Sequence, residues 1–307
     1  MKVLITGGAG FIGSNIADSL VELGFDVVIV DDLSNGKENN INKNASFFKF
    51  DIRDSNLSDI FKKEKPEIVI HNAAQLSVRI SVENPVFDSE VNVVGGLNVF
   101  NCCARAGVKR VIFASSGGTV YGEQKEFPAD EDHSTDPVSP YGVAKLASEK
   151  YLGYYHSQYG LEYTALRYAN IYGPRQDPLG EAGVVAIFSS KILRGEEPVI
   201  NGDGSQTRDY VYVGDAVNAN ILAIKSDFTG CLNIGTGIET DVNKIFLRLR
   251  EASGNDSIRE IHGPAKSGEQ YRSVLDYSLA KRILGWEPKT DVNTGLVKTF
   301  EWFSQNF

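Results

Sequence analysis

The sequence predicts an α/β protein with a doubly wound parallel sheet and a smaller C-terminal domain. Three observations predict this class. Short apolar, β-branched runs alternate with longer stretches of helical spacing through the first half of the chain. A glycine-rich turn follows the first apolar run and opens the first helical stretch. Beyond about residue 170 the alternation weakens, and turn clusters such as Gly202-Asp203-Gly204 and Gly263-Pro264 appear.

Six apolar runs in the first half are expected to be strands, because each is apolar on both faces, as a strand between two helix layers should be. They are residues 2–6, 26–30, 46–50, 68–70, 111–114 and 163–167. A further run, residues 231–234, is expected to rejoin the large sheet. We therefore expect a first domain of residues 1–169, rejoined by parts of 211–240, and a second of residues 170–307.

Two helices have clear ends in the sequence. The first has apolar residues at helical spacing and Gly24 at its expected C-terminus; these residues are Ile12, Ile16, Leu20 and Leu23. The second begins with Ser139 as N-cap and Pro140 at the first helical position, and is expected to run to about Gly160. Residues 34–44 break all periodicity and are expected to form an exposed loop.

Composition excludes several classes of protein. The chain has 307 residues, of which 42% are hydrophobic and 23% charged, so it is neither disordered nor fibrous. Thirty-one Lys plus Arg against 40 Asp plus Glu give 31 − 40 = −9, which disfavours nucleic acid and anionic membranes as partners. The N-terminal apolar run is too short for a signal peptide or a membrane span. Three cysteines, Cys102, Cys103 and Cys231, form neither a disulfide framework nor a metal site, which favours a cytoplasmic setting without a bound metal.

The glycine-rich turn has the context of a Rossmann-type dinucleotide-binding loop, with a strand before it and a helix after it. Gly7 or Gly8 permits the tight turn, Gly10 lets the backbone approach a pyrophosphate, and Gly13 permits close packing of helix on strand. Asp31 follows at the end of the second strand, where its carboxylate would accept hydrogen bonds from a ribose and repel a 2′-phosphate. NAD is therefore favoured over NADP. The alternatives are an ordinary tight turn and a solvated strand end.

Tyr141 and Lys145 lie four residues apart on the second helix, so their side chains project from one face. An ammonium beside a phenol favours the phenolate, and we expect it to lower the pKa of Tyr141 and make that residue a general base. The alternative is a chance spacing, which occurs in many helices.

Six motifs, including the glycine-rich turn and the segment of Tyr141 and Lys145, occur in order along essentially the whole chain and carry a family resemblance. The chain resembles the extended short-chain dehydrogenases/reductases, a family of NAD-dependent epimerases and dehydratases, and within it the UDP-glucose 4-epimerases. The motifs are Gly7-Gly8-Ala9-Gly10-Phe11-Ile12-Gly13, His71-Asn72-Ala73-Ala74-Gln75, Ser115-Ser116-Gly117-Gly118-Thr119-Val120-Tyr121-Gly122, Tyr141-Gly142-Val143-Ala144-Lys145, Arg167-Tyr168-Ala169-Asn170 and Arg208-Asp209-Tyr210-Val211.

The resemblance implies how NAD would be held. Phe11 and Ile12 would bind the pyrophosphate through their backbone, and Lys145 would serve both the nicotinamide ribose and Tyr141. The adenosine ribose would be lined by Asp31, Asp32, Leu33, Ser34, Asn35 and Gly36. The adenine would be read by Asp51 and Ile52, and the rest of the cofactor would be lined by Ala73, Ala74, Gln75, Asn92 and Tyr168.

The resemblance also implies the nucleotide-sugar site. Asn170, Arg208 and Arg272 would grip the diphosphate, because the forked arginine side chain suits phosphate oxygens. Val199 and Asn201 lie where the family binds uracil, and Asn201 replaces an aromatic residue often found there, which leaves thymine or another base open. The best-known epimerases carry a third hydroxyl residue where this chain has Gly117. The helper hydroxyl is therefore assigned to Ser116, with Thr119 as the alternative.

The implied function is NAD-dependent 4-epimerisation of a UDP-hexose through a 4-keto intermediate, in a homodimer formed by the helix of Tyr141 and residues 91–106. Ser273 would stand beside the sugar C2 substituent, where strict glucose epimerases carry a tyrosine, and would admit N-acetylhexosamines. Three alternatives stay open. They are a UDP-glucuronate 4-epimerase or decarboxylase with Arg79 as a loosely placed cation, a 4,6-dehydratase, and a non-catalytic NAD-binding regulator. The dehydratase is disfavoured because that family has an Asp-Glu pair where this chain has Gly117-Gly118.

Overall fold

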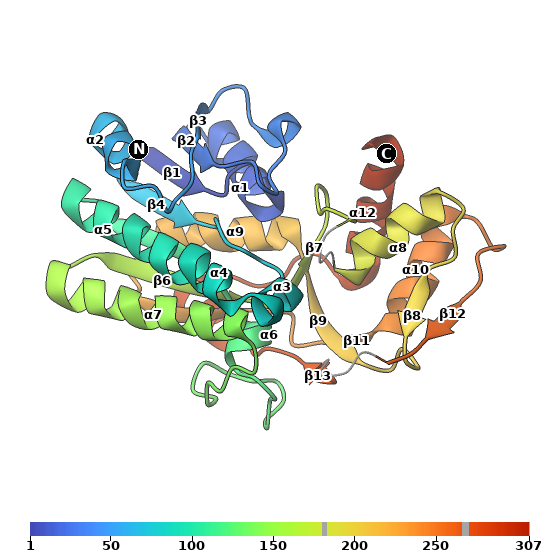
Figure 1. Ribbon diagram of the computed structural model, residues 1–307. Helices are drawn as coiled ribbons and strands as arrows, with labels where there is room; N and C mark the ends of the chain where they lie inside the picture. Colours follow the sequence, from blue (N-terminus) through green and yellow to red (C-terminus); the bar gives the residue numbers. More distant parts are fainter. Residues whose placement is uncertain (180–182, 266–269, 307) are drawn as a thin grey trace.

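The computed structural model describes residues 1–179, 183–265 and 270–306. Within these residues a seven-stranded sheet forms the larger part of the molecule, and the smaller part carries short strands and three helices (Figure 1). The large sheet has the order β10-β6-β5-β4-β1-β2-β3, and every neighbouring pair is parallel. Its strands are β1 (Lys2–Thr6), β2 (Asp26–Asp31), β3 (Ser46–Lys49), β4 (Ile68–His71), β5 (Arg110–Ser116), β6 (Glu162–Tyr168) and β10 (Gly230–Ile234).

Helices cover both faces of this sheet, and each face has its own apolar core. One core joins side chains of β1, β2 and β6 with α1, α9 and α11, and the other joins the opposite faces of the strands with α2, α5 and α7. Parallel strands buried on both sides are apolar throughout, which is why their sequence runs do not alternate. The helices are α1 (Phe11–Glu22), α2 (Leu57–Glu64), α5 (Gly96–Ala106), α7 (Pro140–Tyr159), α9 (Val213–Ile224) and α11 (Ser278–Leu284).

Short helical segments follow the carboxyl ends of β2, β4 and β5. A 3-10 turn, η1 (Glu38–Asn40), interrupts the loop after β2, and α6 (Gly117–Val120) follows β5 directly. Between β4 and α5 the chain forms α3 (Val78–Glu83), α4 (Pro85–Ser89) and a π-helical turn, η2 (Glu90–Gly95). Widened turns of this kind are frequent at functional sites.

The smaller part has a core of its own, formed mainly by three helices that pack on its strands. Its larger sheet has the order β11-β9-β13, with β7 also paired to β9, and a second sheet pairs β12 with β8. These elements are β7 (Asn170–Tyr172), α8 (Val184–Leu193), β8 (Val199–Asn201), β9 (Thr207–Tyr212), β11 (Glu239–Asp241), α10 (Val242–Ser253), β12 (Ile261–Gly263), β13 (Arg272–Ser273) and α12 (Val292–Asn306).

The structure confirms the expected α/β fold, its parallel sheet and both clear helices. Ser139 caps α7 by accepting a hydrogen bond from the Gly142 N–H, and Gly160 ends it in the left-handed conformation. The strand at residues 230–234 does rejoin the large sheet, beside β6. The expectation of a plain exposed loop at residues 34–44 was wrong in part, because η1 forms there and Ile41 packs against the core. The sequence also did not predict that α11 and Trp286 would pack on the large sheet's core.

Candidate functional site

The candidate site lies where the strand order of the large sheet reverses, between β1 and β4. The strands are parallel, so their carboxyl ends share one edge of the sheet. In doubly wound sheets, ligands bind at this edge, where successive connections run to opposite faces. The glycine-rich loop after β1, the segment after β4 and the end of β5 meet here.

The glycine-rich loop is crowded along its length and most severely at its two ends. Gly7 has a φ of +69°, and a Cβ there would lie 2.6 Å from the backbone nitrogen of Ala73. A Cβ at Gly13 would overlap the Gly7 carbonyl oxygen. A Cβ at Gly10 would lie 3.3 Å from that same carbonyl oxygen, which is closer than most Cβ contacts but less crowded than at Gly7 or Gly13. The N–H groups of Phe11 and Ile12 lie in the first turn of α1, where the helix provides no carbonyl partner for them, so they can bind a pyrophosphate.

Asp31 ends β2 with its carboxylate held toward this loop. One oxygen accepts a hydrogen bond from the Ala9 N–H at 2.9 Å and the other from the Leu33 N–H at 2.8 Å. A Cβ at Gly36 would lie 2.6 Å from the Asp31 Oδ1, so the loop can close on the carboxylate only with glycine there. Burial raises the pKa of Asp31, although the two N–H donors oppose this. A fixed carboxylate beside a helix N-terminus fits the ribose and pyrophosphate of NAD.

Tyr141 and Lys145 lie on the first two turns of α7, next to the end of β5. The Lys145 Nζ lies 5.6 Å from the centroid of the Tyr141 ring and donates a hydrogen bond to the Ala114 carbonyl at 2.8 Å. Lys145 is buried, whereas Tyr141 keeps part of its surface exposed. The pair is therefore assembled as the sequence predicts, with the lysine below and the phenol nearer the solvent.

The expectation that Lys145 lowers the pKa of Tyr141 was wrong. Burial raises the pKa of the Tyr141 phenol, and the negative charge of Asp88 raises it further. Burial lowers the pKa of Lys145 to about 8, which the carboxylates of Asp88 and Glu149 oppose. The charge of Lys145 alone therefore does not lower the pKa of Tyr141, because burial of the phenol disfavours its charged form more strongly.

The two serines at the end of β5 have different surroundings. The Ser115 hydroxyl donates a hydrogen bond to the Glu149 carboxylate at 2.5 Å and is buried. Ser116 is partly exposed and is the N-cap residue of α6, and the Thr119 hydroxyl donates to its carbonyl. Gly117, the next residue, has no room for a side chain, because a Cβ there would lie 2.5 Å from the Leu275 Cδ1. Ser116 stays the predicted helper, since Ser115 is already bonded.

A buried ion pair lies behind these serines. Glu149 and Arg167 form a two-point pair, with Nε to Oε1 at 3.0 Å and Nη2 to Oε2 at 2.7 Å. The third nitrogen of the guanidinium donates to the Tyr121 hydroxyl, which donates to Asn233. Bidentate charged bonds of this kind hold geometry tightly. They tie α7, β6 and β10 together beneath the site.

The segment after β4 is held by a second buried network. The Asn92 side chain, in the π-helical turn, accepts from the Gln75 N–H and donates to the Gln75 carbonyl, both at 2.9 Å. The side-chain amides of Gln75 and Asn92 both donate to Asp88 Oδ1, at 2.7 and 2.9 Å. Asn92 and Gln75, which the resemblance assigns to the cofactor, are therefore bonded to each other, and Asp88 joins them.

Comparison with known proteins agrees with this geometry. Residues 3–235 match the model of the NAD dependent epimerase/dehydratase family. The chain is also 44% identical, over 309 residues, to the UDP-glucose 4-epimerase of Mycolicibacterium smegmatis, covering 99% of this chain and 98% of the relative.

The chain belongs to the NAD-dependent epimerase/dehydratase family. Two solved members have the same fold. UDP-glucose 4-epimerase from Thermotoga maritima, solved with UDP-glucose, is 49% identical with a TM-score of 0.98, and the match covers 100% of this chain and 99% of that one. UDP-N-acetylglucosamine 4-epimerase from Methanobrevibacter ruminantium M1, in complex with UDP-N-acetylmuramic acid, is 38% identical with a TM-score of 0.94 over 100% of this chain and 99% of that one.

The residues that the family resemblance assigns to the nucleotide sugar come mainly from the smaller part. Ser273 pairs with Arg208 across β13 and β9, so these two lie side by side. The Arg208 Nη1 donates to the Thr207 carbonyl at 2.8 Å. Arg272 forms a two-point ion pair with Glu239, at 2.8 and 2.9 Å, and stacks over the Phe127 ring at 3.9 Å. A diphosphate at Arg272 would therefore compete with Glu239.

The other assigned residues are spread more widely. Asn170 begins β7 near Gly118, whose Cβ would lie 3.9 Å from the Asn170 Oδ1. Val199 and Asn201 are the two ends of β8, paired with β12, and Ser273 is only 3% exposed. Residues 266–269, which precede Ser273 in the segment used to align it with the family, lie outside the described residues.

On the cofactor side, two assigned residues already have protein partners. Asp51 pairs with Arg53, which lowers the pKa of Asp51. Tyr168 lies in the core and its hydroxyl accepts a hydrogen bond from Asn220 at 2.7 Å. Ile52 is buried against Gly95, whereas Asp32, Ser34 and Asn35 are exposed in the loop that follows Asp31.

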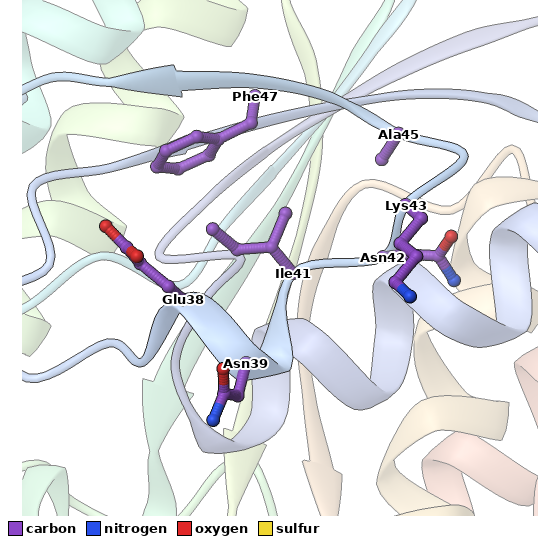
Figure 2. Close-up of a pocket in the computed structure, with 7 residues that line it drawn as sticks. All are labelled: Glu38, Asn39, Ile41, Asn42, Lys43, Ala45 and Phe47. Atoms are coloured by element: carbon purple, nitrogen blue, oxygen red, sulfur yellow. The ribbon is translucent and has the colours of Figure 1, made fainter.

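A hollow of about 550 Å³ lies next to that loop and away from Tyr141 and Lys145. Figure 2 shows the residues that line it, among them the apolar Ile41, Ala45 and Phe47 and the charged Glu38 and Lys43. None of the predicted site residues lines it. Within residues 1–179, 183–265 and 270–306, no helix is long and apolar enough for a membrane span, and no acidic, histidine or cysteine cluster could hold a metal ion.

Sequence reasoning missed Asp88 and Glu149. Asp88 stands four residues before Asn92, and Glu149 stands four after Lys145, so each shares a helix face with a residue already assigned. A spacing of four residues from an assigned residue was the feature of the sequence that could have identified both carboxylates.

Proposed function

We propose that this chain is a UDP-glucose 4-epimerase, which interconverts UDP-glucose and UDP-galactose with NAD as a retained cofactor. The observation that carries the proposal is the position of Tyr141 and Lys145 against the end of β5, in a chain that matches UDP-glucose 4-epimerases along its whole length. A non-catalytic NAD-binding protein would have no use for this pair. The dehydratase alternative lacks its carboxylates, and Gly117 has no space for one.

NAD, when bound, supplies a hydride acceptor for C4 of the sugar and the positive charge of its nicotinamide ring. Tyr141 removes the proton from O4 and later returns it, which lets a 4-keto sugar form and be reduced on its other face. Lys145 binds the nicotinamide ribose and adds its positive charge beside the phenol. Ser116 donates a hydrogen bond to O4 and keeps it near Tyr141. No external reductant is consumed, because each turnover regenerates the cofactor.

The diphosphate is held by Arg208, Arg272 and Asn170, and the base by Val199 and Asn201. The exposed, partly solvated setting of these side chains suits a ligand that must bind and leave. Ser273 replaces a large residue beside the C2 substituent, so UDP-N-acetylglucosamine should also be a substrate. The relative from Methanobrevibacter ruminantium, which is named for that sugar, supports this breadth.

The test is to incubate the purified protein with UDP-glucose, UDP-galactose, UDP-N-acetylglucosamine, UDP-glucuronate and TDP-glucose, and to separate the products by chromatography. We expect interconversion of the first two without added reductant. The Tyr141→Phe variant is the matched control, since it keeps the ring. If only UDP-glucuronate is converted, or if no sugar is, the proposal is wrong.

Substrate breadth has its own variant. Ser273→Tyr should suppress turnover of UDP-N-acetylglucosamine and spare that of UDP-glucose, because a packed wall excludes an oversized group at a cost of roughly 1–3 kcal/mol, about 5- to 150-fold in rate. Equal slowing of both sugars would show that Ser273 does not select between them.

We also propose that the protein is a homodimer in the cytoplasm. Exposed apolar side chains form a stripe along α7 at Val143, Tyr151 and Tyr154, and Val94 continues it on the neighbouring η2. Tyr154→Glu should convert a dimer to a monomer in light scattering, whereas Ile238→Glu, at an exposed apolar site on the smaller part, should not. A monomeric parent protein would contradict the proposal.

A further inference from the structure

Asp88 is a fully buried carboxylate beside the catalytic pair, and no assigned function uses it. It lies on α4 with no exposed surface. Its Oδ1 accepts both amide hydrogen bonds, from Gln75 and Asn92, while its Oδ2 is buried without a partner in the described part of the chain. A buried carboxylate with only one of its oxygens hydrogen-bonded destabilises the folded state unless a nearby positive charge compensates for it.

Lys145 is the cation whose charge acts on Asp88, and α4, which carries Asp88, packs against α7, which carries Lys145. No cation lies within 4.0 Å of Asp88 among the described residues, so the carboxylate is not neutralised by a direct ion pair. Its field acts on Lys145, and the field of Lys145 acts on it in turn. In a buried site such interactions are weakly screened by solvent and extend beyond hydrogen-bond distance.

The other groups facing Lys145 cannot replace Asp88. Glu149 lies one turn further along α7, but its charge is taken up by the two-point pair with Arg167. His71, on β4, is buried, and its pKa is lowered to about 3, so it is neutral at working pH. Tyr141 is protonated unless a base or a bound cation changes it. Asp88 is therefore the one uncompensated negative charge of the described residues that faces Lys145.

Asp88 also connects the catalytic helix to the segment after β4. Through Asn92 it fixes both backbone groups of Gln75, and the Gln75 amide oxygen accepts from the Ser77 N–H. The Asn92 carbonyl accepts from the Ser148 hydroxyl, on the turn of α7 that follows Lys145. The Asp88 carboxylate on α4 thus holds the side-chain amides of Gln75 and Asn92, which link the segment after β4, η2 and α7.

We infer that Asp88 is a positioning residue that keeps Lys145 charged and holds the Ala73–Gln75 segment against the site. It acts through Lys145 and Tyr141 and need not touch the substrate. The inference rests on the proposed function for its kinetic consequence only, because the charge state of Lys145 can be followed without substrate.

The test compares Asp88→Asn, which keeps an oxygen for the two amides but removes the charge, with Glu90→Gln. Glu90 is exposed two residues further on, so this control removes the same charge at a solvated position. Lys145 is titrated by NMR in protein labelled on its lysines, with Lys145→Met identifying the signal. We expect Asp88→Asn to move the titration to lower pH by on the order of half a unit or more, and Glu90→Gln to leave it in place.

The pH profile of turnover provides the second readout. Without the Asp88 charge, Lys145 and Tyr141 both lose protons more readily, so both limbs of the profile should move to lower pH. A fall in turnover with unmoved limbs and an unmoved Lys145 titration would mean that Asp88 is only structural, and would overturn the inference. If Asp88→Asn does not fold, Asp88→Ser removes the same charge, leaves room for water at the amides and must give the same shift. A protein without epimerase activity would contradict the proposed function, and the NMR titration would still decide the role of Asp88.

Discussion

Replacing Gly117 with serine should destabilise the protein, although a hydroxyl residue stands there in the best-known epimerases. The new Cβ would lie 2.5 Å from Leu275 Cδ1, 3.1 Å from its Cδ2 and 3.2 Å from the Arg167 carbonyl oxygen. Leu275 cannot easily yield, because it is fully buried with Val120, Tyr121 and Ala129. Overpacking of this kind costs roughly 1–3 kcal/mol.

That cost converts to a measurable change in melting temperature. An unfolding entropy of about 2.1 cal/mol/K per residue gives about 0.6 kcal/mol/K for 307 residues, so the expected loss is about 2–5 °C. Calorimetry on Gly117→Ser and on Gly118→Ser would measure it. Gly118→Ser is the matched control, since the nearest atom to its Cβ is the Asn170 Oδ1 at 3.9 Å.

A third variant tests the cause. Leu275→Ala alone should lower the melting temperature by about 3–8 °C, from a loss of roughly 2–5 kcal/mol. In the double variant the serine fills part of the space that leucine leaves, so the two losses should not add. Additive losses, or equal melting temperatures for the two serine variants, would refute the reasoning that Leu275 excludes a side chain at Gly117.

The remaining predictions concern the reaction. Tyr141→Phe should lower turnover by roughly 10²-fold or more and leave the melting temperature and NAD binding unchanged, and near-normal turnover would remove Tyr141 from its role. Ser116→Ala should slow turnover more than Thr119→Val, and the reverse order in a kinetic comparison would transfer the helper role to Thr119. NAD should bind far better than NADP in a fluorescence titration, because Asp31 repels a 2′-phosphate, and similar affinities would contradict this. Turnover should fall as pH rises through about 8, where Lys145 loses its charge. The folded-state pKa of Lys145 lies below its ordinary value of 10.5, so the unfolded chain binds more protons between about pH 8 and 10.5, and this group's contribution to stability should rise with pH there.

Local patterns were sufficient for most elements of the large sheet. The runs that became β1, β2 and β4 are apolar on both faces, and α7 has both its cap and its terminating glycine in the sequence. The smaller part was less predictable, because β7, β11 and β13 are two or three residues long and have no periodicity to detect. Such strands exist because distant segments supply their partners.

By itself, the sequence determined the parallel sheet, the glycine-rich loop before α1, the carboxylate at Asp31 and the shared helix face of Tyr141 and Lys145. Each is predicted by a pattern that spans only a few residues, because apolar spacing, glycine content and helical periodicity are local properties of the sequence. The tertiary structure alone decided the electrostatics and the available space. Burial and the charge of Asp88 keep the pKa of Tyr141 high. Leu275, which lies 158 positions after Gly117 in the chain, occupies the space that a side chain at position 117 would need. Desolvation and packing arise from neighbours far apart in the chain, so no local pattern records them.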